Sequence, residues 1–133
     1  MSPSPSTSDS TGPVTAEQAL AAGGLTLPAN SSGETAERMD VSEMQWLEGF
    51  RVTFKAPRSN ALQICRDGGL TGDLPSRRFS PQEQELLGSA VVHTEGTRVC
   101  SGLWPDAMAW QRTVAVAPGD PTTVYVAIAR MGR

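Results

Sequence analysis

This sequence has few lysines and no long apolar run, the features that nucleic-acid binding and membrane insertion require. Lys55 is its only lysine, and eleven basic residues stand against fourteen acidic ones in 133 positions, which gives a formal net charge of −3. A phosphate backbone is bound by a clustered excess of Lys and Arg, so we expect no nucleic-acid partner. No apolar run approaches the roughly 20 residues of a membrane-spanning helix.

The residues from which catalytic and metal sites are built are equally scarce. His93 is the only histidine, and together with Cys65 and Cys100 it lacks both the number and the Cys-x-x-Cys spacing of a zinc site. No serine stands in a G-x-S-x-G elbow, and no glycine-rich segment carries the Lys-Ser/Thr of a phosphate-binding loop. We therefore assign no catalytic residue and expect no metal and no cofactor.

The amino-terminal segment has the composition of a tether. Twelve of its first fifteen residues are Ser, Pro, Thr or Gly, and residues 1–38 carry the whole net charge. A segment with so little to bury cannot offset the entropy lost on ordering. Thr15 and Gln18 match a capping box before an alanine-rich stretch, which predicts a short helix near residues 16–22.

These features divide the chain into two parts. We expect residues 1–37 to form a flexible Ser/Pro/Thr-rich tether that contains the short helix, and residues 38–133 to form a single α+β domain. Whether the short helix docks on the domain is left open by its pattern, because two helical turns are marginal alone.

Within the domain, alternating apolar residues over 50–56 predict a half-buried strand. Ser59 is expected to cap a helix over 60–67 that ends at paired glycines. The segment Ser80-Pro81-Gln82-Glu83 combines an N-cap serine, a first-turn proline and an N3 glutamate, which predicts a helix over 81–87. Residues 40–47 are expected to form a helical turn.

Two hairpins complete the expected fold. Residues 110–117 and 122–130 alternate on either side of a Pro-Gly-Asp turn and predict a C-terminal β-hairpin, and residues 90–93 and 97–100 predict a second one. The predicted fold class is α+β, a small antiparallel sheet with two or three short helices on one face. The other face is less apolar, as Tyr125 indicates, so it is expected to be solvated or to carry a partner.

Cys65 and Cys100 are the residues that report on the cellular compartment. Cys65 falls on the inner face of a predicted helix and Cys100 in a predicted strand, so the two could meet across the helix–sheet interface. We expect a disulfide, because an even number of cysteines in a small domain behind a tether fits an oxidising compartment. The alternative is two separate buried thiols, as is common for free cysteine.

A short segment near residue 104 is the candidate partner-binding region. It contains Trp104, Met108 and Trp110, and Trp and Met are enriched at the centres of protein interfaces. The alternative is that this segment, expected to be a loop, covers the core of the domain.

The chain resembles the mature part of small exported lipoproteins of high-GC Gram-positive (actinobacterial) bacteria. The resemblance comes from the tether, which begins Ser2-Pro3-Ser4-Pro5-Ser6, and from the use of Arg in place of Lys. The resemblance covers about 30 residues and is one of composition. It implies an extracytoplasmic location, as a cell-surface lipoprotein or a secreted protein. Membrane contact would come only through a lipid anchor that is not present in this chain, whose first cysteine is Cys65.

From these observations we expect a non-catalytic extracytoplasmic module that binds an unknown protein or small ligand at the cell envelope. The first alternative is a small redox or hydrolytic enzyme that uses the cysteine pair or His93. The second is a cytosolic protein with reduced thiols.

Overall fold

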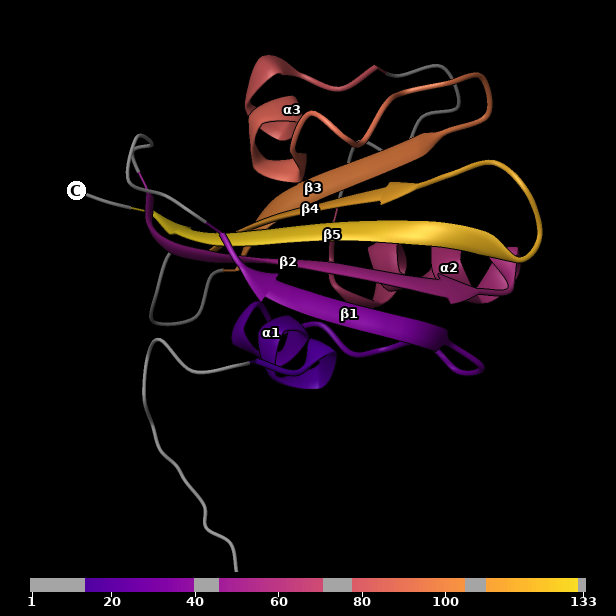
Figure 1. The fold of residues 1–133 in the computed structure, drawn as a ribbon, viewed down its shortest axis with the longest axis horizontal. Helices are drawn as coiled ribbons and strands as arrows, with labels where there is room; N and C mark the ends of the chain where they lie inside the picture. Colours follow the sequence, from indigo (N-terminus) through magenta and orange to yellow (C-terminus); the bar gives the residue numbers. More distant parts are fainter. Residues whose placement is uncertain (1–13, 40–45, 71–77, 105–109, 132–133) are drawn as a thin grey trace, which may run out of the picture.

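The structure is a computed structural model that describes residues 14–39, 46–70, 78–104 and 110–131. Its helices and strands follow in the order α1 (Ala16–Ala22), β1 (Ser32–Arg38), β2 (Trp46–Ala56), α2 (Arg58–Asp67), α3 (Pro81–Leu87), β3 (Arg98–Trp104), β4 (Trp110–Val116) and β5 (Thr122–Met131) (Figure 1). Among the described residues, no helix has the length and apolar character needed to cross a membrane.

One antiparallel sheet in the order β1-β2-β5-β4-β3 forms the centre of the fold. Helices α1 and α2 lie on one face of it and α3 lies on the other (Figure 1). The predicted α+β class, antiparallel sheet and C-terminal hairpin, β4 with β5, are confirmed. The two helices predicted within the domain, α2 and α3, lie on opposite faces, and the helix that shares a face with α2 is α1, whose docking the sequence left open.

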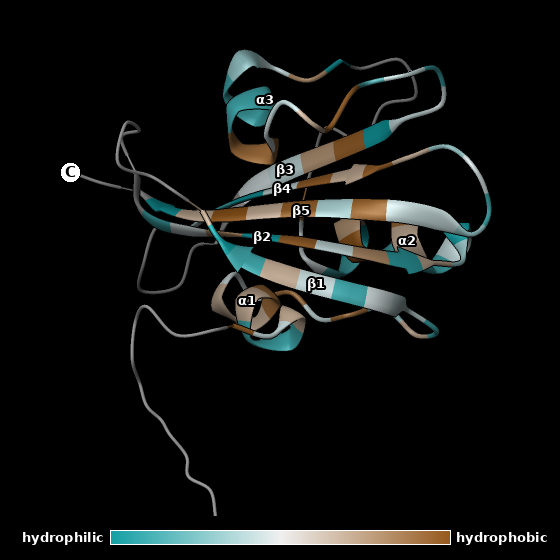
Figure 2. Cartoon of the chain, in the orientation of Figure 1, coloured by the Kyte–Doolittle hydropathy of each residue, from teal (hydrophilic) through white to brown (hydrophobic). Residues whose placement is uncertain are grey.

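The alternation of side chains along β2 and β5 creates two apolar layers, one on each face. The larger layer lies under α1 and α2 and includes Phe54, Val126 and Ile128. The smaller layer lies under α3 and includes Leu86, Ala127 and Ala129. Apolar colour recurs along β5 in Figure 2. Small alanines under α3 let that short helix approach the sheet closely.

The domain begins earlier than residue 38, so the predicted boundary is corrected. The helix predicted near 16–22 is present with its Thr15 capping box, and its Ala19 and Leu20 are fully buried in the larger apolar layer. β1 follows it and pairs with β2 along the sheet. Residues from 14 onward therefore belong to the folded unit, because burial of one face of α1 stabilises a helix too short to form alone. Residues 1–13, the first part of the tether expected over residues 1–37, lie outside the described residues.

Two local predictions are wrong, and a third falls largely outside the described residues. The hairpin of residues 90–93 with 97–100 is wrong, because β3 extends to Trp104 and pairs with β4 instead. The predicted Ser59 cap is also wrong, because α2 starts at Arg58, and the Arg58 amide is bound by the Asp120 carboxylate (3.0 Å). The helical turn of residues 40–47 lies outside the described residues up to 45, and residues 46–47 belong to β2.

A buried arginine joins the two helices to the sheet. Arg112 of β4 is 2% exposed, and its guanidinium donates to the carbonyls of Gly68 (2.7 Å), Gly102 (3.2 Å) and Gly23 (3.3 Å). Gly23 and Gly68 are the C-cap residues of α1 and α2, where helix carbonyls lack partners within the helix. Burial lowers the pKa of Arg112, yet a guanidinium keeps its charge in proteins. This side chain thus acts as a shared C-terminal cap.

Candidate functional site

The two cysteines form the disulfide that the sequence predicted. Cys65 of α2 and Cys100 of β3 have an S–S distance of 2.04 Å and a Cα–Cα distance of 6.1 Å. Both are buried, because each faces the apolar layer between α2 and the sheet. In this state neither sulfur is a thiolate, so neither can serve as a nucleophile or metal ligand.

His93 lies in the connection between α3 and β3, half-buried against an aromatic ring. Its imidazole meets the Phe79 ring edge-on, with ring centroids 5.2 Å apart and an interplanar angle of 87°. Within the described ranges, no three His, Cys, Asp or Glu side chains gather as metal ligands would. The structure therefore places His93 in a packing contact.

Of the three predicted partner-binding residues, Trp110 is the one whose side chain the structure describes. Trp110 is 8% exposed and stacks on Phe50, with centroids 6.2 Å apart, while the Arg130 guanidinium lies 6.0 Å from its ring centroid. Trp110 is thus a core residue, which corrects its assignment to a binding surface. Trp104 ends β3 opposite Trp110 in register, but its side chain and the whole of Met108 lie outside the described residues.

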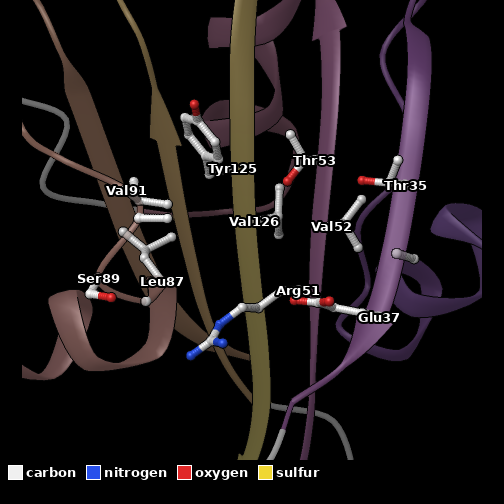
Figure 3. A pocket seen from close by; sticks show the side chains of 13 residues that line it. Thr35, Glu37, Arg51, Val52, Thr53, Leu87, Ser89, Val91, Tyr125 and Val126 are labelled. Atoms are coloured by element: carbon white, nitrogen blue, oxygen red, sulfur yellow. The ribbon is translucent and has the colours of Figure 1, made fainter.

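The strongest candidate site is a cleft on the sheet face that carries α3. α3 packs mainly on β4 and β5, and β1 and β2 lie farther from it on this face. The cleft has a volume of about 360 Å³ and lies between β1, β2 and the residues that follow α3 (Figure 3). Its lining comprises Thr35, Ala36, Glu37, Arg51, Val52, Thr53, Leu87, Gly88, Ser89, Ala90, Val91, Tyr125 and Val126.

Arg51 fixes one wall of the cleft. Its Nε donates to the Leu86 carbonyl (2.7 Å) and its Nη2 to the Glu85 carbonyl (3.2 Å), so the guanidinium caps the C-terminal end of α3. Gly88 makes this contact possible. A Cβ at Gly88 would lie 3.3 Å from Arg51 Cζ, and the φ of +98° is one that only glycine adopts readily.

Gln84 holds the residues after α3 in place. Its side-chain amide donates to the carbonyls of Gly88 (3.0 Å) and Val91 (2.8 Å). The cleft wall formed by Ser89 and Ala90 is therefore tied back to the helix at both ends. A site built on such fixed elements loses little entropy when a ligand binds.

The opposite side of the cleft is polar. Thr35 and Thr53 are register partners on β1 and β2, and Glu37 is the register partner of Arg51 (Figure 3). No described residue hydrogen-bonds to the side-chain hydroxyls of Thr35, Thr53 or Tyr125. With Ser89 on the other wall, the cleft therefore offers four hydroxyls, an exposed carboxylate and a positive guanidinium above the apolar side chains of Leu87 and Val91.

Part of this site was visible in the sequence. The position of Tyr125 in β5 indicated a less apolar face that could carry a partner. Thr35 and Glu37 were missed because their composition matched a tether, and only their pairing with β2 brings them to the cleft. The residues after α3 carried no signal for this role.

Comparisons with protein-family models, with curated proteins and with solved structures find no significant match to this chain.

Proposed function

We propose that the protein is a non-catalytic binding module of an extracytoplasmic compartment, and that the cleft beside α3 holds its ligand. The observation that carries the proposal is the set of polar groups that converge on one cleft, among which the hydroxyls of Thr53 and Tyr125 have no bond from the described residues. Small-molecule sites typically combine an apolar surface with a small number of polar groups.

The ligand is a small polar molecule with both donors and acceptors of hydrogen bonds. Arg51 supplies donors and Glu37 supplies acceptors, while the hydroxyls can do either. A ligand with several hydroxyls, or with an ammonium and a carboxylate, satisfies both kinds of group. Leu87 and Val91 then contact its carbon skeleton.

The disulfide supports the extracytoplasmic location. Cys65 and Cys100 are joined and buried, and stable structural disulfides persist in oxidising compartments. The cytosolic alternative would require these buried sulfurs to be reduced. The enzyme alternative would require a thiolate or an activated His93, whereas His93 packs on Phe79.

A binding screen with matched variants tests the proposal. Saturation-transfer NMR on the wild-type chain, with a panel of monosaccharides, disaccharides and free amino acids, identifies ligands. Thr53→Val and Tyr125→Phe remove only hydroxyls from the cleft and should weaken each true ligand about fivefold or more. Thr123→Val, on the same face of β5 but outside the cleft lining, is the control and should bind as wild type. A panel without binders, or binders insensitive to both variants, would refute the cleft as the site.

A further inference from the structure

The outer edge of β1 is an unpaired edge of the sheet. β1 stands at one end of the strand order and pairs with β2 alone (Figure 1). The Met39 amide donates to the Gly49 carbonyl (2.8 Å), which fixes which residues face β2. Inward and outward backbone groups alternate in an antiparallel ladder, so Glu37 bonds to β2, whereas Ala36 and Arg38 direct their amides and carbonyls outward.

Most side chains of this edge are exposed. Every residue of β1 is exposed except Ala36, which is half-buried and packs against the apolar layer under α1. Exposed edges invite pairing with a second strand, and many proteins prevent it with charged side chains, β-bulges or proline. β1 has no proline, its register with β2 shifts between Ser32 and Thr35, and its charges are of both signs, so they can pair with those of a second copy.

We propose that two copies of this chain associate through an antiparallel pairing of their β1 strands, with the two-fold axis at Ala36. At the axis each Ala36 amide donates to the carbonyl of the partner's Ala36. Glu34 then stands opposite the partner's Arg38, and the same pair occurs again on the other side of the axis. Opposite charges in directly facing positions stabilise an antiparallel pair.

The positions of the side chains agree with this register. Arg38 lies over the Phe50 ring, with its Cζ 5.1 Å from the centroid, and therefore projects on the face that carries α1. Glu34 and Ala36 line a second cavity beside α1, so they project on the same face. The small Ala36 side chain leaves room for its counterpart at the axis.

Neighbouring registers are less favourable. An axis at Glu34, Glu37 or Arg38 places that charge opposite its own copy, which repels. An axis at Thr35 sets no acidic residue opposite a basic one. The charge pattern of β1 therefore selects Ala36, and this self-complementarity is why a second copy is the occupant that fits the edge.

The association would bring two clefts together. Thr35 and Glu37 line the cleft beside α3, and in this register Thr35 faces the partner's Glu37. The two clefts then lie next to each other on one sheet of ten strands. Seven residues per strand form a small interface, so we expect a weak dimer that depends on concentration. This inference does not depend on the ligand proposed for the cleft.

Sedimentation velocity of the full oxidised chain from about 5 to 500 µM tests the proposal. Wild type should pass from monomer to dimer with rising concentration. Ala36→Pro removes an outward amide and leaves the bonds to β2 intact, so the variant should stay monomeric while its circular dichroism is unchanged.

A charge swap tests the register itself. Glu34→Arg and Arg38→Glu should each raise the dimer dissociation constant about tenfold or more, and the double variant should return toward wild type because the pair is restored in reverse. Glu95→Arg, an exposed residue in the turn before β3, makes the same charge change and should have no effect. A wild type that remains monomeric overturns the proposal and leaves the edge open to a strand of another protein. Failure of the double variant to recover overturns the register.

Discussion

Replacing both cysteines by alanine measures how much of the stability comes from the crosslink. Cys65 and Cys100 are 35 positions apart, so the bridge closes a loop of 36 residues. The chain-entropy relation assigns such a loop about 13 cal/mol/K, or about 4 kcal/mol at 25 °C. Alanine is the suitable replacement, because both sulfurs are buried and a serine hydroxyl there would lack a partner.

The assay is thermal unfolding of wild type and of Cys65→Ala/Cys100→Ala, followed by circular dichroism and calorimetry. A domain of this size loses about 4 °C in Tm for each kcal/mol, so the expected decrease in Tm is about 15 °C. Reductant present during unfolding should lower the wild-type Tm by a similar amount and leave the variant unchanged. This control separates the crosslink from the packing of the substituted side chains.

Two results would refute this reasoning. A Tm decrease below about 4 °C would show that the loop constrains the unfolded chain much less than the relation states. Titration of two free thiols in denatured, unreduced protein would show that Cys65 and Cys100 are not joined at all.

Three further substitutions test the local arguments, each by urea unfolding. Arg112→Met leaves the carbonyls of Gly23, Gly68 and Gly102 without this donor and should lower the free energy of unfolding by about 3 kcal/mol or more; a loss below about 1 kcal/mol would contradict its role as a shared cap. Gly88→Ala should lower the free energy of unfolding by about 2 kcal/mol, and Gly69→Ala by about 1 kcal/mol. Both glycines have a positive φ, but only at Gly88 does the new Cβ lie next to Arg51. Equal losses would count against that contact. Ser80→Ala removes the hydroxyl that accepts from the Glu83 amide and should cost about 1 kcal/mol, and an unchanged midpoint would show that the capping box of α3 is not needed.

Local signals in the sequence were sufficient for several elements. The Ser80 capping box defined α3, and the alternation of residues 50–56 defined the centre of β2. These predictions depend on neighbours within one turn of a helix or on a two-residue repeat, which the chain carries in itself. The disulfide was predictable as a pairing because the chain has only two cysteines.

The errors came where a residue's role depends on distant parts of the chain. The polar strand β1 has a composition typical of a tether, yet its backbone pairs with β2 and its neighbour α1 buries Leu20 in the core. Trp110 has the composition signal of an interface, yet it stacks on Phe50, which lies 60 positions away. Composition does not encode such contacts.

The sequence by itself determined the α+β class, the helices and strands with strong local patterns and the shortage of catalytic groups, because these follow from residue type and short-range pattern. The pairing of Cys65 with Cys100 was expected from the sequence, but it depends on the contact between α2 and β3. Only the tertiary structure decided the strand order, the placement of α3 on the second face and the cleft that joins Thr35 and Glu37 to Arg51 and Tyr125. Register and layer packing depend on backbone hydrogen bonds and apolar contacts between segments far apart in the chain, which local patterns leave undetermined.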